Sequence, residues 1–87
     1  MSDERVVIQP GPIFYEVFTG LLKAQGTPVS EFAKKHEVTI TNLKFMASGA
    51  SNGPKSRKIR DAMMRAVDAD AFRIMYERRL RIEGLLK

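Results

Sequence analysis

The chain has 87 residues, enough for one compact domain with short tails and too few for a second hydrophobic core. Hydrophobic residues make up 44% of it and charged residues 29%, values close to globular averages, which excludes a disordered or low-complexity protein. The 15 lysines and arginines exceed the 10 aspartates and glutamates, and this net charge of +5 points to a polyanionic partner.

The positive surplus is confined to the C-terminal part of the chain. Residues 1–48 hold five basic and five acidic side chains, whereas residues 49–87 hold ten basic and five acidic ones. A core as thin as 87 residues allow is often completed by a partner chain, so oligomerisation is also expected.

Several kinds of chemistry are excluded by what the sequence lacks. Without cysteine there is no disulfide framework, thiolate nucleophile or cysteine-based metal site. One histidine, no glycine-rich phosphate loop and no carboxylate pair in an apolar context argue against an enzyme, a metal, a cofactor or a small-molecule substrate. No signal peptide and no stretch of about 18 apolar residues is present, so we expect a soluble cytoplasmic protein that does not contact membranes.

The first predicted helix begins at Pro12, after an N-terminal arm of residues 1–11. Proline suits the first turn of a helix because its missing N–H has no partner there. Apolar residues then recur at spacings of three and four, the pattern of a helix with one buried face. They are Ile13, Phe14, Val17, Phe18, Leu21 and Leu22. Gly26 ends this helix in the left-handed conformation.

Two short helices follow. Thr27 as N-cap and Pro28 at the first helical position predict a second helix that runs to Lys35 or His36. Residues 38–41 resemble a strand by their β-branched side chains alone. The apolar spacing that continues beyond them, with Thr39 as an N-cap, instead predicts a third helix from Ile40 to Ser48.

A loop and two further helices complete the predicted fold. Residues 48–54 are dense in turn formers. Lys55 and Ser56 then open a fourth helix, and its inner face is formed by Ile59, Met63, Ala66 and Val67. Either Asp68 or Asp70 caps a fifth helix over residues 69–85. The predicted fold class is therefore all-α, with five helices and a long C-terminal helix.

The segment 29–48 resembles the helix-turn-helix of the lambda-repressor and Cro family. Ala33 takes the place of the small residue that lets the second helix cross close above the first. The positions that the family keeps apolar are filled by Phe32, Val38, Leu43 and Met46. Glu37 departs from the family's turn glycine, at a cost of about 1 kcal/mol in the left-handed conformation. His36 replaces an apolar residue and is expected to be partly buried.

The resemblance implies a five-helix lambda-repressor-like fold, in which residues 12–68 form the helix-turn-helix DNA-binding domain. Its third helix would lie in the major groove and contact bases. The candidate base contacts are Thr39, Thr41, Asn42, Lys44, Phe45 and Ser48, with packing or a mixed role favoured for Phe45. The candidate phosphate contacts are Lys34, Lys35, Ser51, Asn52, Lys55, Arg57 and Lys58.

The C-terminal helix, residues 69–87, carries two apolar stripes. One stripe, with Phe72, Met75, Tyr76 and Leu80, completes the core. The other would be exposed in a monomer, which predicts a homodimer through Ile74, Ile82, Leu85 and Leu86. The alternative is that the arginines of this helix reach phosphate, namely Arg73, Arg78, Arg79 and Arg81.

The expected function is that of a sequence-specific regulator of transcription bound to double-stranded DNA in the nucleoid. The simplest form is a small dimeric repressor that occludes a promoter, like the compact regulators of phages and other mobile elements. The alternative is a helical interaction module, antitoxin-like or adaptor-like, whose basic face binds an acidic protein or RNA.

Overall fold

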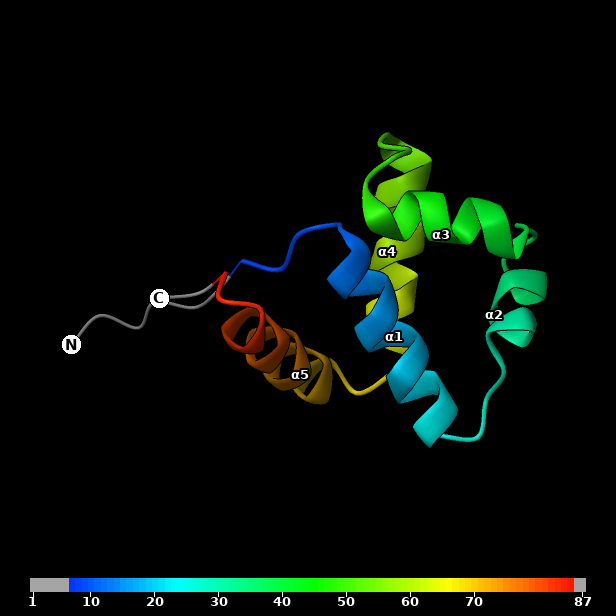
Figure 1. Cartoon of the computed structure of the whole chain (residues 1–87). Coiled ribbons are helices and arrows are strands. Elements are labelled where there is room, and N and C mark those ends of the chain that lie inside the picture. Colours follow the sequence, from blue (N-terminus) through cyan, green and yellow to red (C-terminus); the bar gives the residue numbers. More distant parts are fainter. Residues whose placement is uncertain (1–6, 86–87) are drawn as a thin grey trace.

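The computed structural model describes residues 7–85, and these form five α-helices and no strand, so the all-α prediction is confirmed. The helices are α1 (Pro12–Ala24), α2 (Val29–Lys35), α3 (Ile40–Ser48), α4 (Pro54–Ala66) and α5 (Ala69–Ile82). Figure 1 shows α1 near the middle of the molecule, with α2 and α3 on one side and α5 on the other.

Helix α1 ends where its glycine was predicted to end it. Gly26 has a φ of +78°, the left-handed region that glycine occupies without steric cost. The backbone N–H of Thr27 donates to the carbonyl of Leu22 at 3.0 Å, and that of Gly26 donates to Lys23 at 3.0 Å. These two bonds form a Schellman closure, which satisfies carbonyls that the end of a helix leaves unpaired.

The predicted start of α2 is wrong by one residue. Pro28, with φ −70° and ψ 145°, is the N-cap, and no side chain of the described residues caps this helix. Thr27 was predicted as the cap, but its backbone already closes α1. Because Pro28 is extended, the helix begins at Val29.

The predicted end of α5 also needs correction. The helix stops at Ile82, three residues before Leu85. Gly84 has a φ of +74°, and the N–H of Leu85 donates to the carbonyl of Leu80 at 2.8 Å. A second Schellman closure around this glycine therefore ends the helix.

Two N-cap predictions and the turn prediction are confirmed. The Thr39 hydroxyl accepts a hydrogen bond from the backbone N–H of Asn42 at 3.0 Å. The Asp68 carboxylate accepts from Asp70 and Ala71, at 2.9 and 3.1 Å, so Asp68 is the cap of α5. Glu37, between α2 and α3, has a φ of +56°, the left-handed geometry expected at that position.

The core gathers around α1 and draws on every helix. The Phe14 ring lies 4.9 Å from Phe72 of α5, and the Phe18 ring lies 5.1 Å from Phe32 of α2. Further buried side chains come from α3, α4 and the residue after α4, and they include Leu43, Met46, Ile59, Met63 and Val67. Burial of these apolar surfaces drives the packing of α1 against its neighbours.

The small residue expected in α2 is buried, and the apolar residues near it are buried or half-buried. Ala33 and Phe32 are buried, and Val38 is half-buried against the core. His36 is half-buried as predicted, with its ring 4.3 Å from that of Phe32. Helices α2 and α3 therefore meet over the apolar residues that the pattern indicated.

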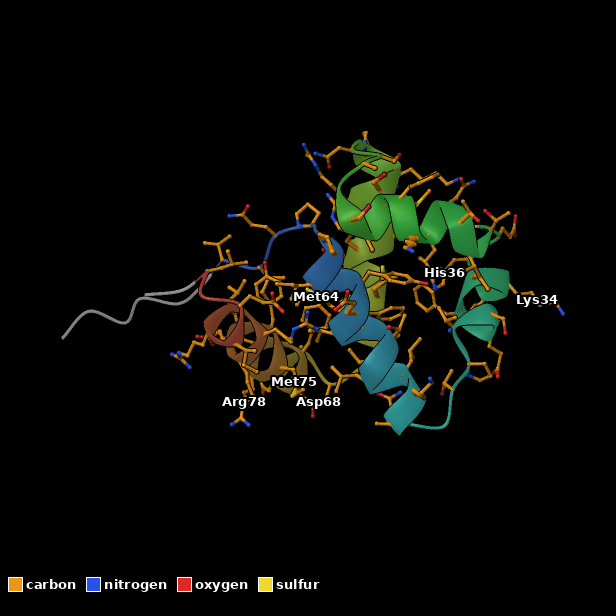
Figure 2. All side chains as sticks on the ribbon, viewed as in Figure 1. Lys34, His36, Met64, Asp68, Met75 and Arg78 are labelled. Atoms are coloured by element: carbon orange, nitrogen blue, oxygen red, sulfur yellow. The ribbon has the colours of Figure 1, made fainter. Side chains whose placement is uncertain are left out.

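Two predicted core positions are exposed. Ala66 was placed on the inner face of α4, but it is the last residue of that helix, and the following Val67 turns inward instead. Met75 was placed with Phe72 and Tyr76, but its side chain is exposed beside α1. Figure 2 labels Met75 on α5, and its side chain borders a hollow with Val17 and Leu21 of α1.

The described part of the predicted N-terminal arm, residues 7–11, joins α5 to α3. The backbone N–H of Gln9 donates to the Tyr76 hydroxyl oxygen at 3.2 Å. The same hydroxyl donates its hydrogen to the Gln9 carbonyl at 3.3 Å. The N–H of Gly11 donates to the Ala47 carbonyl at 2.9 Å. Ile8, just before these two attachments, packs against the core.

The left-handed conformation at position 37 predicts a specific stability difference. Glu37→Gly should be more stable than Glu37→Ala by about 1 kcal/mol, because only glycine adopts a positive φ without steric strain. The two variants lose the same carboxylate, so their difference isolates the backbone. Urea denaturation followed by circular dichroism measures it, and equal midpoints would contradict the expectation.

Candidate nucleic-acid interface

The predicted base-contacting residues lie on or beside the outer face of α3. Leu43, Met46 and Ala47 point into the core. At 3.6 residues per turn, Thr41 and Phe45 stand opposite these buried residues. The exposed side chains of the segment are Thr39, Ile40, Thr41, Asn42, Lys44 and Phe45, and Ser48 is half-buried. Asn42 lies on one flank, a turn before Met46.

Phe45 is half exposed. Packing or a mixed role was favoured, and the exposure of 48% of its surface excludes full burial in the core and leaves the mixed role as the prediction. The inner face of α3 is already filled, so Phe45 points outward from the same face as Thr41. Its ring is available to contact an apolar group of a partner, such as a thymine methyl.

Ser48 has limited capacity to bind an anion. Its hydroxyl donates to the Phe45 carbonyl at 3.2 Å. A serine has a single hydroxyl hydrogen, so in this geometry Ser48 offers only acceptor lone pairs to a partner. It can therefore accept from a base amino group while this bond persists.

Three successive carbonyls at the end of α3 are hydrogen-bonded from three different segments. The Phe45 carbonyl accepts from the Ser51 N–H at 3.1 Å, and the Ala47 carbonyl accepts from the Gly11 N–H at 2.9 Å. Between them, the Met46 carbonyl accepts from the Arg60 guanidinium at 2.8 Å. The loop, the N-terminal arm and α4 thus hold the C-terminal turn of α3.

Arg60 was seen in the sequence as one of four clustered cations, and the structure gives it a different environment. Besides Met46, its guanidinium donates to the Asn52 side-chain oxygen at 3.0 Å. Arg60 is half-buried, so it positions α3 and the following loop.

The other three clustered cations, Lys55, Arg57 and Lys58, are exposed at the start of α4. They have no ion pair with any carboxylate of residues 7–85. Gly53 is the N-cap, no described side chain caps this end, and its first turn holds no acidic residue. Unpaired N–H groups, the positive end of the helix and three cations therefore coincide beside α3.

The two loop residues predicted to contact phosphate are partly engaged within the protein. The Ser51 hydroxyl lies 3.4 Å from that of Ser56. Asn52 uses its side-chain oxygen to accept from Arg60, which leaves its amide hydrogens for another acceptor. Asn52 remains a candidate phosphate donor, and Ser51 is tied to the loop.

The two lysines of α2 do not join this cluster. Lys35 lines a hollow with Ala66 and Arg65, at the C-terminal end of α4, whereas the cation cluster lies at the N-terminal end. The 13 residues of α4 put about 20 Å between its ends. Figure 2 shows Lys34 pointing into solvent at the end of α2.

The outer stripe of α5 is exposed as the sequence predicted. The exposed fractions are 61% for Ile74, 71% for Ile82 and 68% for Leu85. Leu86 lies outside the described residues. Val7 of the N-terminal arm is also 70% exposed, and the arm is attached to the same helix through Tyr76.

The arginines of α5 have different surroundings. Arg79 pairs with Glu16 of α1 at 2.7 Å and with Glu83 at 3.3 Å. The hydrogen bond to Glu16 raises the pKa of the Arg79 guanidinium above its ordinary value. Arg78 points into solvent (Figure 2).

A comparison of the chain with protein-family models, curated proteins and solved structures found no match. Within residues 7–85, no group of three or more histidine, cysteine, aspartate or glutamate side chains is arranged to hold a metal ion. The helices over those same residues are too short or too polar to span a membrane.

The hydrogen bonds of Arg60 predict that its substitution lowers the stability of the fold more than substitution of a neighbouring exposed cation does. Arg60→Met should destabilise the fold by about 1–3 kcal/mol, since the Met46 carbonyl and the Asn52 oxygen lose their donor. Arg57→Met, one turn away and exposed, should stay within about 0.5 kcal/mol of the wild type. Urea denaturation of both variants tests this, and equal losses would show that Arg60 has no positioning role.

Proposed function

We propose that this protein is a sequence-specific regulator of transcription that binds double-stranded DNA through a helix-turn-helix of the lambda-repressor and Cro type. The observation that carries the proposal is the exposed outer face of α3 beside the uncapped, cation-bearing start of α4. The first surface suits base edges, and the second suits the phosphate backbone.

The side chains on α3 support base readout. An asparagine can bond an adenine edge through two hydrogen bonds, so Asn42 is the leading candidate for specificity. Thr41 and Phe45 present a methyl group and a ring at the centre of the outer face, where a thymine methyl would lie. The anchored last turn of α3 supports a fixed orientation of these groups in the groove.

The start of α4 supports phosphate binding. Lys55, Arg57 and Lys58 crowd a helix end that already carries partial positive charge, an arrangement that destabilises the helix unless an anion is near. A DNA phosphate would neutralise the cations and accept from the unpaired N–H groups. The same cations would supply most of the salt dependence of binding.

A homodimer with promoter occlusion completes the proposal. The exposed residues Ile74 and Ile82 of α5, with Leu85 just beyond its end, supply an apolar surface for a second copy. Two copies would bind two half-sites about 34 Å apart, one helical turn of DNA. A dimer bound across a promoter in the nucleoid would repress transcription by excluding the polymerase.

DNA binding is tested by selection from a random duplex pool, with the affinity of the selected sequence then measured as a function of salt. Asn42→Ala should relax the preference at one base position, by roughly 5- to 150-fold. Arg57→Ala should weaken binding to all sequences alike and lower the slope of log affinity against log salt by about 1.

Lys23→Ala is the matched control, because Lys23 is an exposed cation near the C-terminal end of α1. It should leave both preference and salt slope unchanged. No duplex binding by the wild type at 50 mM salt would contradict the proposal. Binding to RNA or to an acidic protein in place of duplex DNA would favour an interaction module.

The dimer is tested by sedimentation of the wild type and of Ile74→Glu. The wild type should sediment as a dimer, whereas the variant should be monomeric, because a carboxylate would be buried in the apolar contact. Lys23→Glu adds a carboxylate elsewhere and should remain dimeric. A monomeric wild type, both free and on the selected duplex, would show that this surface does not pair.

A further inference from the structure

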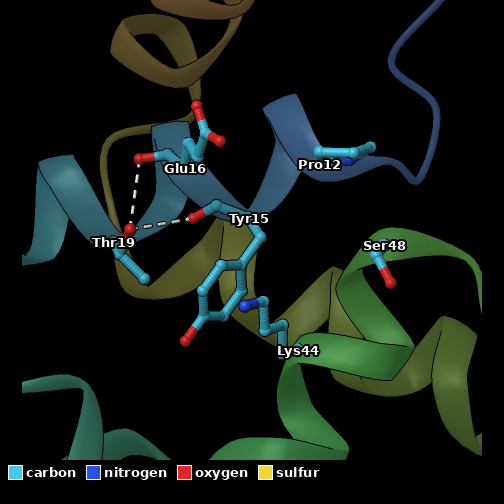
Figure 3. Close-up of a pocket in the computed structure, with 6 residues that line it drawn as sticks. All are labelled: Pro12, Tyr15, Glu16, Thr19, Lys44 and Ser48. Atoms are coloured by element: carbon cyan, nitrogen blue, oxygen red, sulfur yellow. Dashed lines mark hydrogen bonds between the residues drawn. The ribbon is translucent and has the colours of Figure 1, made fainter.

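A hollow of about 270 Å³ lies between the exposed edges of α1 and α3. It is on the flank of α3 that faces away from Asn42. It is lined by Pro12, Tyr15, Glu16, Thr19, Lys44 and Ser48. Figure 3 shows Lys44 extending from α3 towards the ring of Tyr15 on α1. The ring and the proline make most of this surface apolar, with a cation at its edge.

Few groups in the hollow are able to donate a hydrogen bond to a ligand. The Thr19 hydroxyl donates back to the carbonyls of Tyr15 and Glu16, at 3.0 and 3.2 Å, as Figure 3 shows. The Ser48 hydroxyl donates to the Phe45 carbonyl. The remaining donors are the Lys44 ammonium and the Tyr15 hydroxyl, which has no hydrogen-bond partner among residues 7–85. An anionic group with an apolar neighbour is the ligand that this combination fits.

A helix in the major groove has a sugar-phosphate backbone on each side, because the groove is about as wide as the helix with its side chains. Figure 1 shows α3 crossing between the start of α4 and α1. The cations of α4 therefore face one strand. The hollow beside α1 lies on the flank that would face the other strand.

We propose that this hollow binds a deoxyribose and its phosphate from the second DNA strand, with Lys44 and Tyr15 as the phosphate ligands. The inference rests on the proposed function and deepens it. The sugar would pack on Pro12 and the Tyr15 ring, and the phosphate would accept from the Lys44 ammonium. Lys44 is then a backbone contact instead of a reader of guanine.

The carboxylate of Glu16 also borders the hollow and would repel a phosphate. Figure 3 shows that this carboxylate points away from Lys44. It lies 2.7 Å from the Arg79 guanidinium, so its charge is paired with α5. Arg79 thus acts as a positioning residue, since it holds the carboxylate away from the phosphate and compensates its charge.

Lys44→Met and Tyr15→Phe test the hollow on the selected duplex. Lys44→Met should weaken binding by about eightfold at 0.1 M salt and lower the salt slope by about 0.9, as the loss of one phosphate contact requires. The base preference should not change. Tyr15→Phe should weaken binding by a smaller factor, because it keeps the ring and loses only the hydroxyl. Arg65→Met removes one exposed charge in the last turn of α4, which does not border the hollow, and is the control.

The outcomes separate this inference from the proposed function. If Lys44→Met changes the preference at one base and keeps the salt slope, Lys44 reads a base and the inference is overturned. If wild type and Lys44→Met bind equally well, the hollow does not face DNA. If the wild type binds no duplex, the proposed function fails first.

A second experiment uses the ion pair between Arg79 and Glu16. Arg79→Met should weaken DNA binding by about threefold, because it leaves a carboxylate beside the phosphate with no partner. The double variant with Glu16→Gln should recover the wild-type affinity, although it lacks the same arginine. Thermal melts of both variants show whether the fold persists. Equal affinity of the single and double variants would overturn the role of this pair.

Discussion

The arrangement of the candidate interface depends on the hydrogen bonds at the C-terminal end of α3. A helix leaves its last carbonyls without partners inside the helix. Here Phe45, Met46 and Ala47 find donors in the loop, in α4 and in the N-terminal arm. Because each donor comes from a different segment, these bonds tie α3 to the segments on either side of it.

This anchoring divides the basic residues after α3 into two kinds. Arg60 is held by a carbonyl and by Asn52, and it orders the loop. Lys55, Arg57 and Lys58 lie at the start of the same helix and extend into solvent. These four cations lie within six positions of one helix but have different roles. The helix directs the Arg60 side chain towards α3 and the other three side chains away from it.

The N-terminal arm and α5 connect the two proposed interfaces. Tyr76 of α5 holds the backbone of Gln9, and Gly11, two residues later, bonds the end of α3. Arg79 of the same helix pairs with Glu16 at the edge of the hollow beside α1. The helix proposed to meet a second copy is thus joined by short routes to the C-terminal end of the helix proposed to meet DNA and to the hollow on one of its flanks.

The sequence by itself determined the number and kind of helices, most of their boundaries, the N-cap Thr39 and the pair of aspartates that supplies the cap of α5. These features follow from local rules: apolar spacing, the chemistry of Thr39 and Asp68, and the left-handed preference of Gly26. The sequence-based prediction of the N-cap of α2 was wrong because the backbone of Thr27 closes α1 and so cannot also begin the next helix. The predicted end of α5 was wrong because the Schellman closure at Gly84 ends that helix before Leu85.

Only the tertiary structure decided which exposed groups share a surface. Lys35 and Arg57 look alike in the sequence. In the structure Lys35 lies beside the C-terminal end of α4, whereas Arg57 lies in its first turn. Arg60 and the hollow beside α1 depend on segments distant in the chain, so periodicity within one helix carries no information about them. Side-chain type and spacing are local properties, whereas the partners of an arginine or a carbonyl are set by how the helices pack.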